Sequence, residues 1–583
     1  MENYVNDVLI PEENLSLEKL VIAAGASVQA PENKLITLTV DGVHRDITAG
    51  TYEGNVVLSV TDPVLYEAEN HGKTEQYRMN AAVSVRDGIY VPQESVAAAQ
   101  ICGSFREGAA DGLRIRSEGD YFGGFYIDGD SHYEINDADI ALNGHGASDA
   151  VGHGAGIAVR GSAEVTINRA QIHNVGSIRT ALQVCDHAKV IVNDSEFSAA
   201  DDDRPNYVQA MSKAPWMLGI HGRVRTTNIQ DYGEVTYNRC KITAENWGAL
   251  STDGTRHVRL RLYDSEITVT GCGYGAYSIG DCHDYFNHCS ITTPDYGVIQ
   301  CSEARVTYTN GTVVEAGRSA VMMHGEGDTG LLRIDDGSRV HTAGPAIQVK
   351  GRGADIEIDN AVLASDSGVL LQVIANDDPN GRGVHLGPET VMDVPPGGFP
   401  GGGPGDPMLE QAGGPGGGPG GPGGPGGPGD GPGGPGGSPG GPPQAAEDHN
   451  AAKAVISRTA LQGDILNCDT AMRDVEITLT GASLTGRIST AVSSHPNGMP
   501  LCAEQYALIG RVEMTACPND HPYGIRVKLE KNSSWTVSAA SWLTSLEIEE
   551  GSTVNCSSLT VNGISVPVQP GSYTGKILLL PQV

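Results

Sequence analysis

The chain has 583 residues, with 78 glycines, few phenylalanines and 19% charged residues, a composition that suits many short strands and turns. Its formal net charge of −33 repels phosphate backbones and anionic lipid headgroups, so neither nucleic acid nor a membrane is expected as a partner. The same charge disfavours polyanionic substrates unless calcium bridges the charges, so we expect a neutral or small substrate.

The first residues, 1–7, contain neither a basic segment nor an apolar one, and the eleven cysteines include no CxxC pair. We therefore expect a cytoplasmic protein with reduced thiols. A secreted protein whose leader has been removed would show the same pattern, and that alternative stays open.

Residues 1–84 are predicted to form a β cap, because a related unit recurs in a second predicted cap at 541–583. Thr39-Val-Asp-Gly-Val matches Thr560-Val-Asn-Gly-Ile, and the phrases beginning at Gly50 and Gly571 match without a gap. The open ends of a stack of strands must be covered, which is the role expected of these units. They could instead pair with each other, within one chain or between two.

A short segment recurs about every 25 residues through 85–394. Its first and third positions are apolar almost throughout, so they should point inward, while the second and fourth line an outer face. This pattern predicts a right-handed parallel β-helix, in which one such strand from each coil stacks on the next. The segments begin at Ile157, Leu182, Leu218, Leu250, Tyr277, Ile299, Met322, Ile347 and Leu371.

Residues 395–444 form a Gly/Pro-rich tract that cannot build a core. Its Gly-Gly-Pro frame is not kept strictly, which argues against a collagen triple helix. Strand-like patterns resume near Ala451, so 445–540 is predicted to continue the same β-helix. A separate C-terminal domain is the alternative.

The coil period, the DSxF-like turns and phrases such as Ser534-Trp-Thr-Val resemble the pectate-lyase-like right-handed β-helix superfamily, in particular its Gly-rich bacterial proteins. The resemblance covers residues 85–555 and implies the fold. It selects no function, because the superfamily includes polysaccharide lyases, glycosidases, epimerases, esterases and non-catalytic surface proteins.

The fourth position of the recurring segment supplies the candidate catalytic residues. It places His221 between Cys185 and Asp253 on neighbouring coils, about 4.8 Å apart. A carboxylate so placed orients an imidazole, so His221 is the predicted acid or base and Asp253 its partner. Arg160 is the predicted anion stabiliser, and Asp128 extends the series upstream. A nucleophilic Cys185 and a merely solvated polar face are the alternatives.

Insertions at 143–153, 199–215 and 223–233 surround these coils, and long loops around a rigid face are where sites are usually built. Their charged and aromatic residues suit a polyhydroxylated or aromatic ring, and Asp202 and Asp203 are further acid–base candidates. The predicted substrate-binding residues are Tyr126, Tyr207, Lys213, Trp216, Arg223, Tyr277, His145 and His153.

A metal could bind the two histidines of 143–153, but glycine-flanked histidines are also common in turns, so no metal is predicted apart from calcium as an alternative. No GxGxxG, P-loop or PLP-lysine motif is apparent, so no cofactor is predicted. The expected function is therefore that of a cofactor-free lyase, isomerase or hydrolase acting on a small polyhydroxylated ring, such as a carbohydrate or a phenolic. The alternative is a non-catalytic, adhesin-like or assembly scaffold, and a homo-oligomer fits either.

Overall fold

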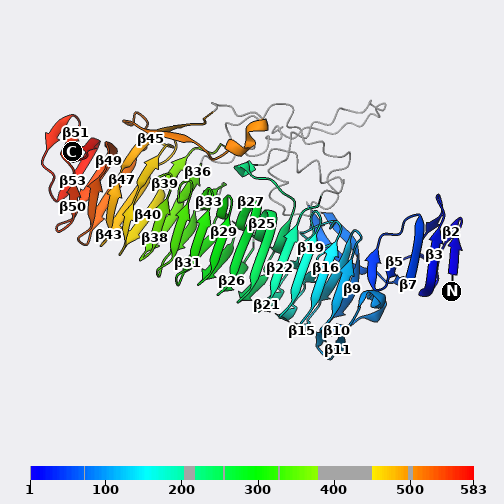
Figure 1. Ribbon diagram of the computed structural model, residues 1–583. Helices are drawn as coiled ribbons and strands as arrows, with labels where there is room; N and C mark the ends of the chain where they lie inside the picture. The colour runs from blue at the N-terminus through cyan, green and yellow to red at the C-terminus, as the bar shows by residue number, and fades with distance from the viewer. Residues whose placement is uncertain are drawn as a thin grey trace, which may run out of the picture.

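The computed structural model describes residues 2–70, 73–202, 217–253, 256–325, 329–377, 450–496 and 503–582. The regular structure of these residues is β-strand with a few short 3-10 helices, and most strand pairs are parallel. The strands form one elongated stack with the two termini at opposite ends (Figure 1). The predicted all-β class with long parallel sheets is confirmed.

Three ladders of parallel strands run along the stack, and each repeating unit of the chain adds one strand to each ladder in turn. Ladder one contains β12 (Ala109–Asp111), β15 (His132–Asn136), β18 (Glu164–Asn168), β21 (Lys189–Asn193), β24 (Glu234–Asn238), β26 (Val258–Tyr263), β28 (Cys282–Asn287), β31 (Arg305–Thr309), β34 (Gly330–Ile334), β37 (Ala354–Asp359), β40 (Ala452–Ser457), β43 (Val475–Thr480), β47 (Ile525–Glu530) and β49 (Ser541–Ile548).

Ladder two lies beside ladder one and divides into two sheets between β38 and β41. It contains β13 (Arg114–Ser117), β16 (Asp139–Asn143), β19 (Gln171–Val175), β22 (Glu196–Ala200), β25 (Lys241–Thr252), β27 (Glu266–Ile279), β29 (Ser290–Thr293), β32 (Val313–Ala316), β35 (Arg339–Thr342), β38 (Val362–Ser365), β41 (Ala460–Gln462), β44 (Ser483–Gly486), β48 (Ser534–Val537) and β50 (Thr553–Asn555).

Ladder three carries the recurring segment of the sequence. It shares the long strands β25 and β27 with ladder two. The second half of β25 pairs with β23 and β27, and the second half of β27 also pairs with β30. Its other strands are β9 (Lys73–Arg86), β14 (Phe122–Asp128), β17 (Ile157–Val159), β20 (Leu182–Val184), β23 (Arg225–Ile229), β30 (Tyr296–Cys301), β33 (Ser319–His324), β36 (Ile347–Lys350), β39 (Val369–Ile374), β42 (Asp464–Asn467) and β45 (Ile488–Ser494).

The remaining elements lie at the two ends of the stack or beside the ladders. They are β1 (Glu2–Val5), β2 (Val8–Leu9), β3 (Leu15–Ile22), β4 (Ser27–Val28), β5 (Leu35–Val40), β6 (Val43–Arg45), β7 (Gly50–Thr61), β8 (Val64–Asn70), β10 (Ile89–Tyr90), η1 (Pro92–Glu94), η2 (Ala97–Ala99), β11 (Ser104–Arg106), η3 (Met217–Gly219), η5 (Ala503–Leu508), β46 (Glu513–Ala516), β51 (Ser558–Val561), β52 (Ile564–Val566) and β53 (Gly571–Leu580).

The inward side chains of the three ladders form one continuous hydrophobic core along the stack. Ile157, Leu182 and Leu250 of ladder three belong to it, and each buried side chain of this size contributes roughly 1.5–3 kcal/mol. Each repeating unit contacts only the units directly before and after it in the stack. Its inward side chains are therefore covered only when the units stack.

The turn from ladder one to ladder two explains the repeated DSxF-like phrases. Asn168 donates a hydrogen bond to the Asn136 side chain at 2.8 Å, and Asn193 and Asn238 extend this row at 2.9 Å each. The next residue of each turn, such as Asp194 with a φ of 51°, lies in the left-handed region that Asn and Asp tolerate. The turn sequence is therefore set by side-chain stacking and backbone conformation together.

The strands on either side of the Gly/Pro tract pair with each other. Ala354 of β37 lies opposite Ala452 of β40, and β39 pairs in parallel with β42. The tract itself lies outside the described residues. Ladders one and three continue in parallel pairs from one side of it to the other, with one register shift between Val369 and Leu371 of β39, whereas ladder two divides there.

The predicted register of ladder three is wrong in two places. The strand between Leu182 and Leu250 contains Thr227, and Leu218 lies in η3 instead. Further along, Ala276 lies opposite Leu250 where Tyr277 was predicted, so Tyr277 points outward, and the next two inward residues are likewise one position earlier than predicted. The inward series is Ile157, Leu182, Thr227, Leu250, Ala276, Val298, Val321, Ile347 and Leu371.

Candidate functional site

His221 is not on the outer series that contains Cys185 and Asp253, so the predicted geometry is wrong. The position between those two residues belongs to Gln230, which follows β23. His221 follows η3, and its Nδ1 lies 3.6 Å from the Sγ of Cys272. Leu218 fits the apolar pattern of an inward strand residue because it is buried. Its neighbours, however, are aromatic side chains on the outer side of ladder three.

Asp253 is engaged in a buried ion pair. Its Oδ2 lies 2.7 Å from Nη1 of Arg225, and the same nitrogen lies 2.9 Å from the Asp149 carboxylate. Asp149 belongs to the predicted insertion 143–153, so that loop is bound to ladder three through one guanidinium. The insertion predicted at 223–233 contains the ladder-three strand β23 (Arg225–Ile229), so that part of it belongs to the stack and is not a loop.

Arg160 and Cys185 lie side by side in the outer series, as predicted, but both are buried. The Arg160 guanidinium lies 4.0 Å from the ring centre of Tyr66 and donates a hydrogen bond to the carbonyl of Val151. Burial raises the pKa of the Cys185 thiol to about 11, so a thiolate nucleophile is disfavoured at neutral pH. Asp128 precedes Arg160 and accepts a hydrogen bond from the adjacent Gly129 amide.

The other predicted residues near this face hold loops in place. The Tyr126 hydroxyl donates to the carbonyl of Gly152 at 2.9 Å. His145 lies 3.7 Å from Asp202, whose carbonyl accepts a hydrogen bond from Arg223 at 2.8 Å. The structure thus brings together several residues that the sequence had placed in one site. Their contacts hold the loops against ladder three.

Of two further candidates, Tyr277 is buried and His153 is half-buried. Burial, aided by the positive charges of Arg160 and Arg179, lowers the pKa of His153 to about 4, so this imidazole is neutral at pH 7. The Tyr277 hydroxyl lies 3.5 Å from Nε2 of His324. Asp203, Tyr207, Lys213 and Trp216 lie outside the described residues, and their predicted roles stay predictions.

An open groove lies further along ladder three, between β33, β36, β39 and β42 on one side and residues 510–514 on the other. Its volume is about 580 Å³, within the range of roughly 300–1,000 Å³ typical of ligand sites. We call residues 503–516, which form its outer wall, the strap. The polar side chains that line the groove include Arg318, Gln348, Gln372, Asp464, Arg487, Arg511 and Glu513, and the apolar ones include Val369, Leu466 and Met514.

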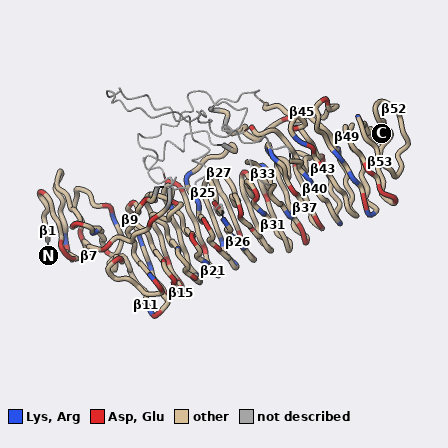
Figure 2. The backbone as a smooth tube through the Cα atoms, turned by 180° about the vertical axis from the view of Figure 1, so that it is seen from behind, with Lys and Arg blue, Asp and Glu red and all other residues tan. Residues whose placement is uncertain are grey.

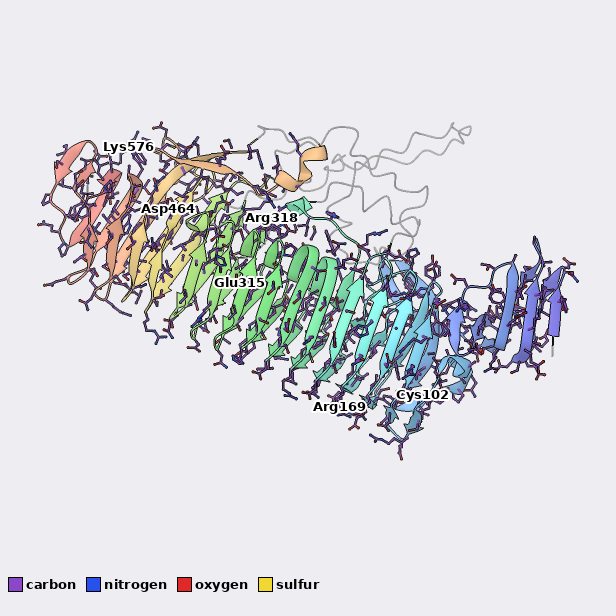
Figure 3. All side chains as sticks on the ribbon, viewed as in Figure 1. Cys102, Arg169, Glu315, Arg318, Asp464 and Lys576 are labelled. Carbon is purple, nitrogen blue, oxygen red and sulfur yellow. The ribbon has the colours of Figure 1, made fainter. Side chains whose placement is uncertain are left out.

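Arg318 joins the strap to η3 above ladder three. Its Nη1 donates hydrogen bonds to the carbonyls of Leu218 at 3.2 Å and Ile509 at 3.0 Å. Its Nη2 donates to the carbonyls of Gly219 at 2.7 Å and Ala507 at 3.1 Å. Figure 3 shows Arg318 beneath these two segments and Asp464 further along the same face. One side chain therefore positions two covering segments that are far apart in sequence.

The charge of Arg318 is balanced by Asp295, whose carboxylate lies 2.7 Å from its Nε. Arg511, on the strap, interacts electrostatically with both Arg318 and Asp295. Burial and the positive charge of Arg318 lower the pKa of Arg511, while Asp295 opposes that change. The end of the groove near η3 thus presents two guanidinium groups for one buried carboxylate.

A buried polar chain supports the strap from below. The Lys350 ammonium lies 2.6 Å from one oxygen of Asp377, and Nε2 of His495 lies 3.0 Å from the other. The amide of Gly510 also donates to Asp377, at 2.7 Å. Charges removed from water are costly unless they are paired, so this arrangement fixes where the strap lies.

Planar polar side chains form the floor of the groove. Gln348 donates to the Oε1 of Gln372 at 2.5 Å and to the carbonyl of Gly510 at 2.6 Å. Asp464 accepts a hydrogen bond from the backbone amide of Arg487 at 2.8 Å, and the two side chains lie 3.6 Å apart. These contacts fix the orientation of amide and carboxylate groups that border the groove.

Sequence reasoning missed this groove because its parts come from both sides of the Gly/Pro tract. Gln348 and Gln372 stand at the second position of the recurring segment, where the sequence does show Gln183, Gln300, Gln348 and Gln372 as a series. The register shift separates these residues, since Gln183 and Gln348 point outward whereas Gln300 points inward. The strap shows no sequence signal of its own.

A second hollow, of about 640 Å³, lies on the outer face of ladder one. Charged side chains of both signs line it, among them Arg305, Glu357 and Lys453. Such charges are interspersed along the whole of this face around β21, β26, β31 and β37 (Figure 2). A solvated strand face explains this hollow, so the groove on ladder three is the better candidate site.

Within the described ranges, no three His, Cys, Asp or Glu side chains lie together as a possible metal site. No helix formed by the described residues is long and apolar enough to span a membrane. No protein-family model matches the chain, and no curated protein matches it either.

Proposed function

We propose that the chain is a right-handed parallel β-helix that binds a carbohydrate in the groove on ladder three and acts on it by cofactor-free acid–base chemistry. The regular passage of the chain through ladders one, two and three supports the coil, and parallel connections of this kind are right-handed in about 98% of cases. The observation that carries the binding proposal is the polar lining of the groove.

A polyhydroxylated ring fits this lining. Amide and carboxylate groups such as those of Gln372 and Asp464 can each accept and orient ring hydroxyls, while guanidinium groups such as Arg487 donate in a fixed plane. Val369, Leu466 and Met514 add the apolar surface that contacts the ring carbons. The groove also has a less negative lining than the chain as a whole, so a neutral or weakly anionic sugar is favoured.

Two carboxyl groups face this groove from opposite sides. Asp464 belongs to β42 on the floor, and Glu513 belongs to β46 on the strap. In glycoside hydrolysis one carboxyl group donates its proton to the leaving oxygen as the glycosidic C–O bond breaks. The other takes a proton from the water that adds to the ring carbon. Asp464 and Glu513 are the acid–base pair of this proposal, in place of His221 and Asp253.

Calorimetric titration with a panel of neutral and uronate-containing oligosaccharides tests the proposal. Gln372→Ala should weaken binding by about 10-fold or more, because a hydrogen-bonding group on the floor is lost. Asp464→Asn should keep affinity within a few-fold while turnover falls by about 10²-fold or more. Glu357→Gln, on the outer face of ladder one, is the matched control and should leave both unchanged.

Absence of binding to every sugar, or wild-type affinity in Gln372→Ala, would remove the basis for a carbohydrate site. Binding with no turnover in the wild-type protein would instead favour the second candidate, a non-catalytic scaffold. That candidate is supported by the duplicated units at the two ends of the stack.

A further inference from the structure

The two ends of the chain carry the same structural unit. In the leading unit, residues 2–61, β3 pairs antiparallel with β7, as β49 pairs with β53 in the trailing unit, residues 526–580. The pairing is interrupted after Leu17 in the first unit and after Leu543 in the second. The parallel pairs β1–β3 and β2–β4 likewise recur as β47–β49 and β48–β50. By this correspondence β1 equals β47, β2 equals β48 and β6 equals β52.

Even the turn between β6 and β7 is built in the same way. The Tyr52 hydroxyl donates to the carbonyl of Thr48 at 3.0 Å, and the Tyr573 hydroxyl donates to the carbonyl of Gln569 at 2.8 Å. The corresponding surfaces of the two units can therefore be compared residue by residue.

In the leading unit, the edge formed by β6 is covered by the stack that follows. Val43 lies opposite Arg116 and His44 opposite Ser117 in a parallel pair with β13, the first strand of ladder two. The His44 ring stacks on Phe122 with the ring centres 4.3 Å apart, and His44 is only 5% exposed. This edge of the unit is thus a junction that accepts a ladder-two strand.

The matching edge of the trailing unit is open. Among the described residues β52 pairs with β51 alone, and Ile564, which corresponds to Val43, is 70% exposed. Val568 and Leu580 are also exposed, where the leading unit has Ile47 and the buried Ser59. This edge is more apolar than its covered counterpart, although water reaches it. An exposed apolar edge strand is a template for pairing with another chain.

The leading unit has a complementary open edge. β1 and β2 correspond to β47 and β48, which pair on their outer sides with β43 and β44. In the described part of the chain, β1 pairs only with β3 and β2 only with β4. The exposed side chains here are also apolar: Tyr4 is 57% exposed, and Val8 and Ile10 are exposed too.

We propose that copies of this chain join head to tail, with β52 of one copy pairing in parallel with β2 of the next. This contact would repeat a pairing already present within the chain, that of β6 with the ladder-two strand β13. β52 is the counterpart of β6, and β2 is the counterpart of another ladder-two strand, β48. The two edges lie at opposite ends of the stack (Figure 1), so each copy uses one edge at each end and the assembly stays open. The proposal does not depend on the ligand of the groove.

Light scattering on the full chain tests the proposal through the dependence of mass on concentration. The wild-type mass should rise between about 1 and 100 μM, the range in which moderate interfaces associate. Ile564→Lys with Val568→Lys blocks the trailing edge, and Tyr4→Lys with Val8→Lys blocks the leading edge. Each double variant alone should stay monomeric over that range. Val362→Lys, at an exposed position on ladder two, should assemble like the wild type.

A mixture of the two double variants identifies the contact. One open leading edge and one open trailing edge remain, so the mixture should form dimers that grow no further. A wild-type chain that stays monomeric would overturn the proposal, as would a blocked variant that dimerises alone, which would show a symmetric contact. Circular dichroism melting checks that each variant is folded, and Ile564→Thr replaces the lysine variant if it is not.

Discussion

Arg225 and Asp253 form a buried ion pair in which Nη1 lies 2.7 Å from Oδ2. Asp149 lies 2.9 Å from the same nitrogen, so one guanidinium holds two carboxylates and ties the 143–153 loop to ladder three. Asp253 has a structural partner, and the imidazole that it was predicted to orient is elsewhere.

Replacing the shared cation should therefore affect stability strongly. Arg225→Met should lower the free energy of unfolding by about 3–5 kcal/mol, because the buried carboxylate of Asp253 and the half-buried carboxylate of Asp149 lose their counter-charge. Urea denaturation measures the change. Asp194→Asn, which breaks the exposed pair with Arg239, is the control and should cost less than about 1 kcal/mol. Equal losses in the two variants would contradict the buried role of Arg225.

Thiol labelling should separate Cys185 from Cys102. Burial raises the pKa of Cys185 to about 11, whereas Cys102 is exposed. We expect Cys102 to react with iodoacetamide at pH 7.5 at least about 10²-fold faster, because the reaction needs an accessible thiolate. Mass spectrometry of timed samples gives both rates. Rapid alkylation of Cys185 in the folded protein would revive the nucleophilic alternative.

Asp284 should make stability depend on pH. It lies inside the core and accepts hydrogen bonds from Thr252 and Ser278, and burial raises its pKa from 3.8 to about 7. Between these values the folded state binds the proton more tightly than the unfolded state. Stability should therefore fall as pH rises from about 4 to about 7, by up to about 4 kcal/mol, and then level off.

The neutral isostere provides the comparison for Asp284. Asp284→Asn should remove most of that slope, since the amide does not titrate. Unfolding midpoints measured at half-unit steps of pH show the difference between the two proteins. Parallel profiles in the variant and the wild type would assign the slope to other groups.

The strap should loosen when Arg318 is removed. Arg318→Met deletes four hydrogen bonds to carbonyls of η3 and the strap while keeping an apolar stem. Hydrogen exchange of amides in 503–514 should speed up by about 10-fold or more, because the local opening free energy falls. Arg333→Met on ladder one, where the side chain is exposed, should leave these amides unchanged.

Deletion of residues 397–443 should leave the ladders folded, with a change of less than about 2 kcal/mol in unfolding free energy. The reason is that β37 and β40, on either side, pair directly in register. Thermal unfolding of the deletion variant measures this. A larger loss would mean that the tract packs on the stack or mediates assembly.

The sequence by itself determined the strand class, the parallel stacking and the length of the repeating unit. Those properties follow from local patterns, since apolar residues alternate with polar ones and Asn or Asp marks each turn. The match between the two end units was also visible from residues such as Tyr52 and Tyr573. A pattern repeated many times is read reliably even when single members deviate.

Only the tertiary structure decided the register of ladder three and the position of the groove. Leu218 satisfies the apolar pattern by packing on the outer side, whereas Thr227 takes the strand position without any apolar signal. The groove depends on Arg318 holding the strap over β33, β36 and β39, which precede the strap by more than a hundred residues. Contacts of this kind depend on which segments cover a face, and an alternating pattern specifies only which side of a strand is buried.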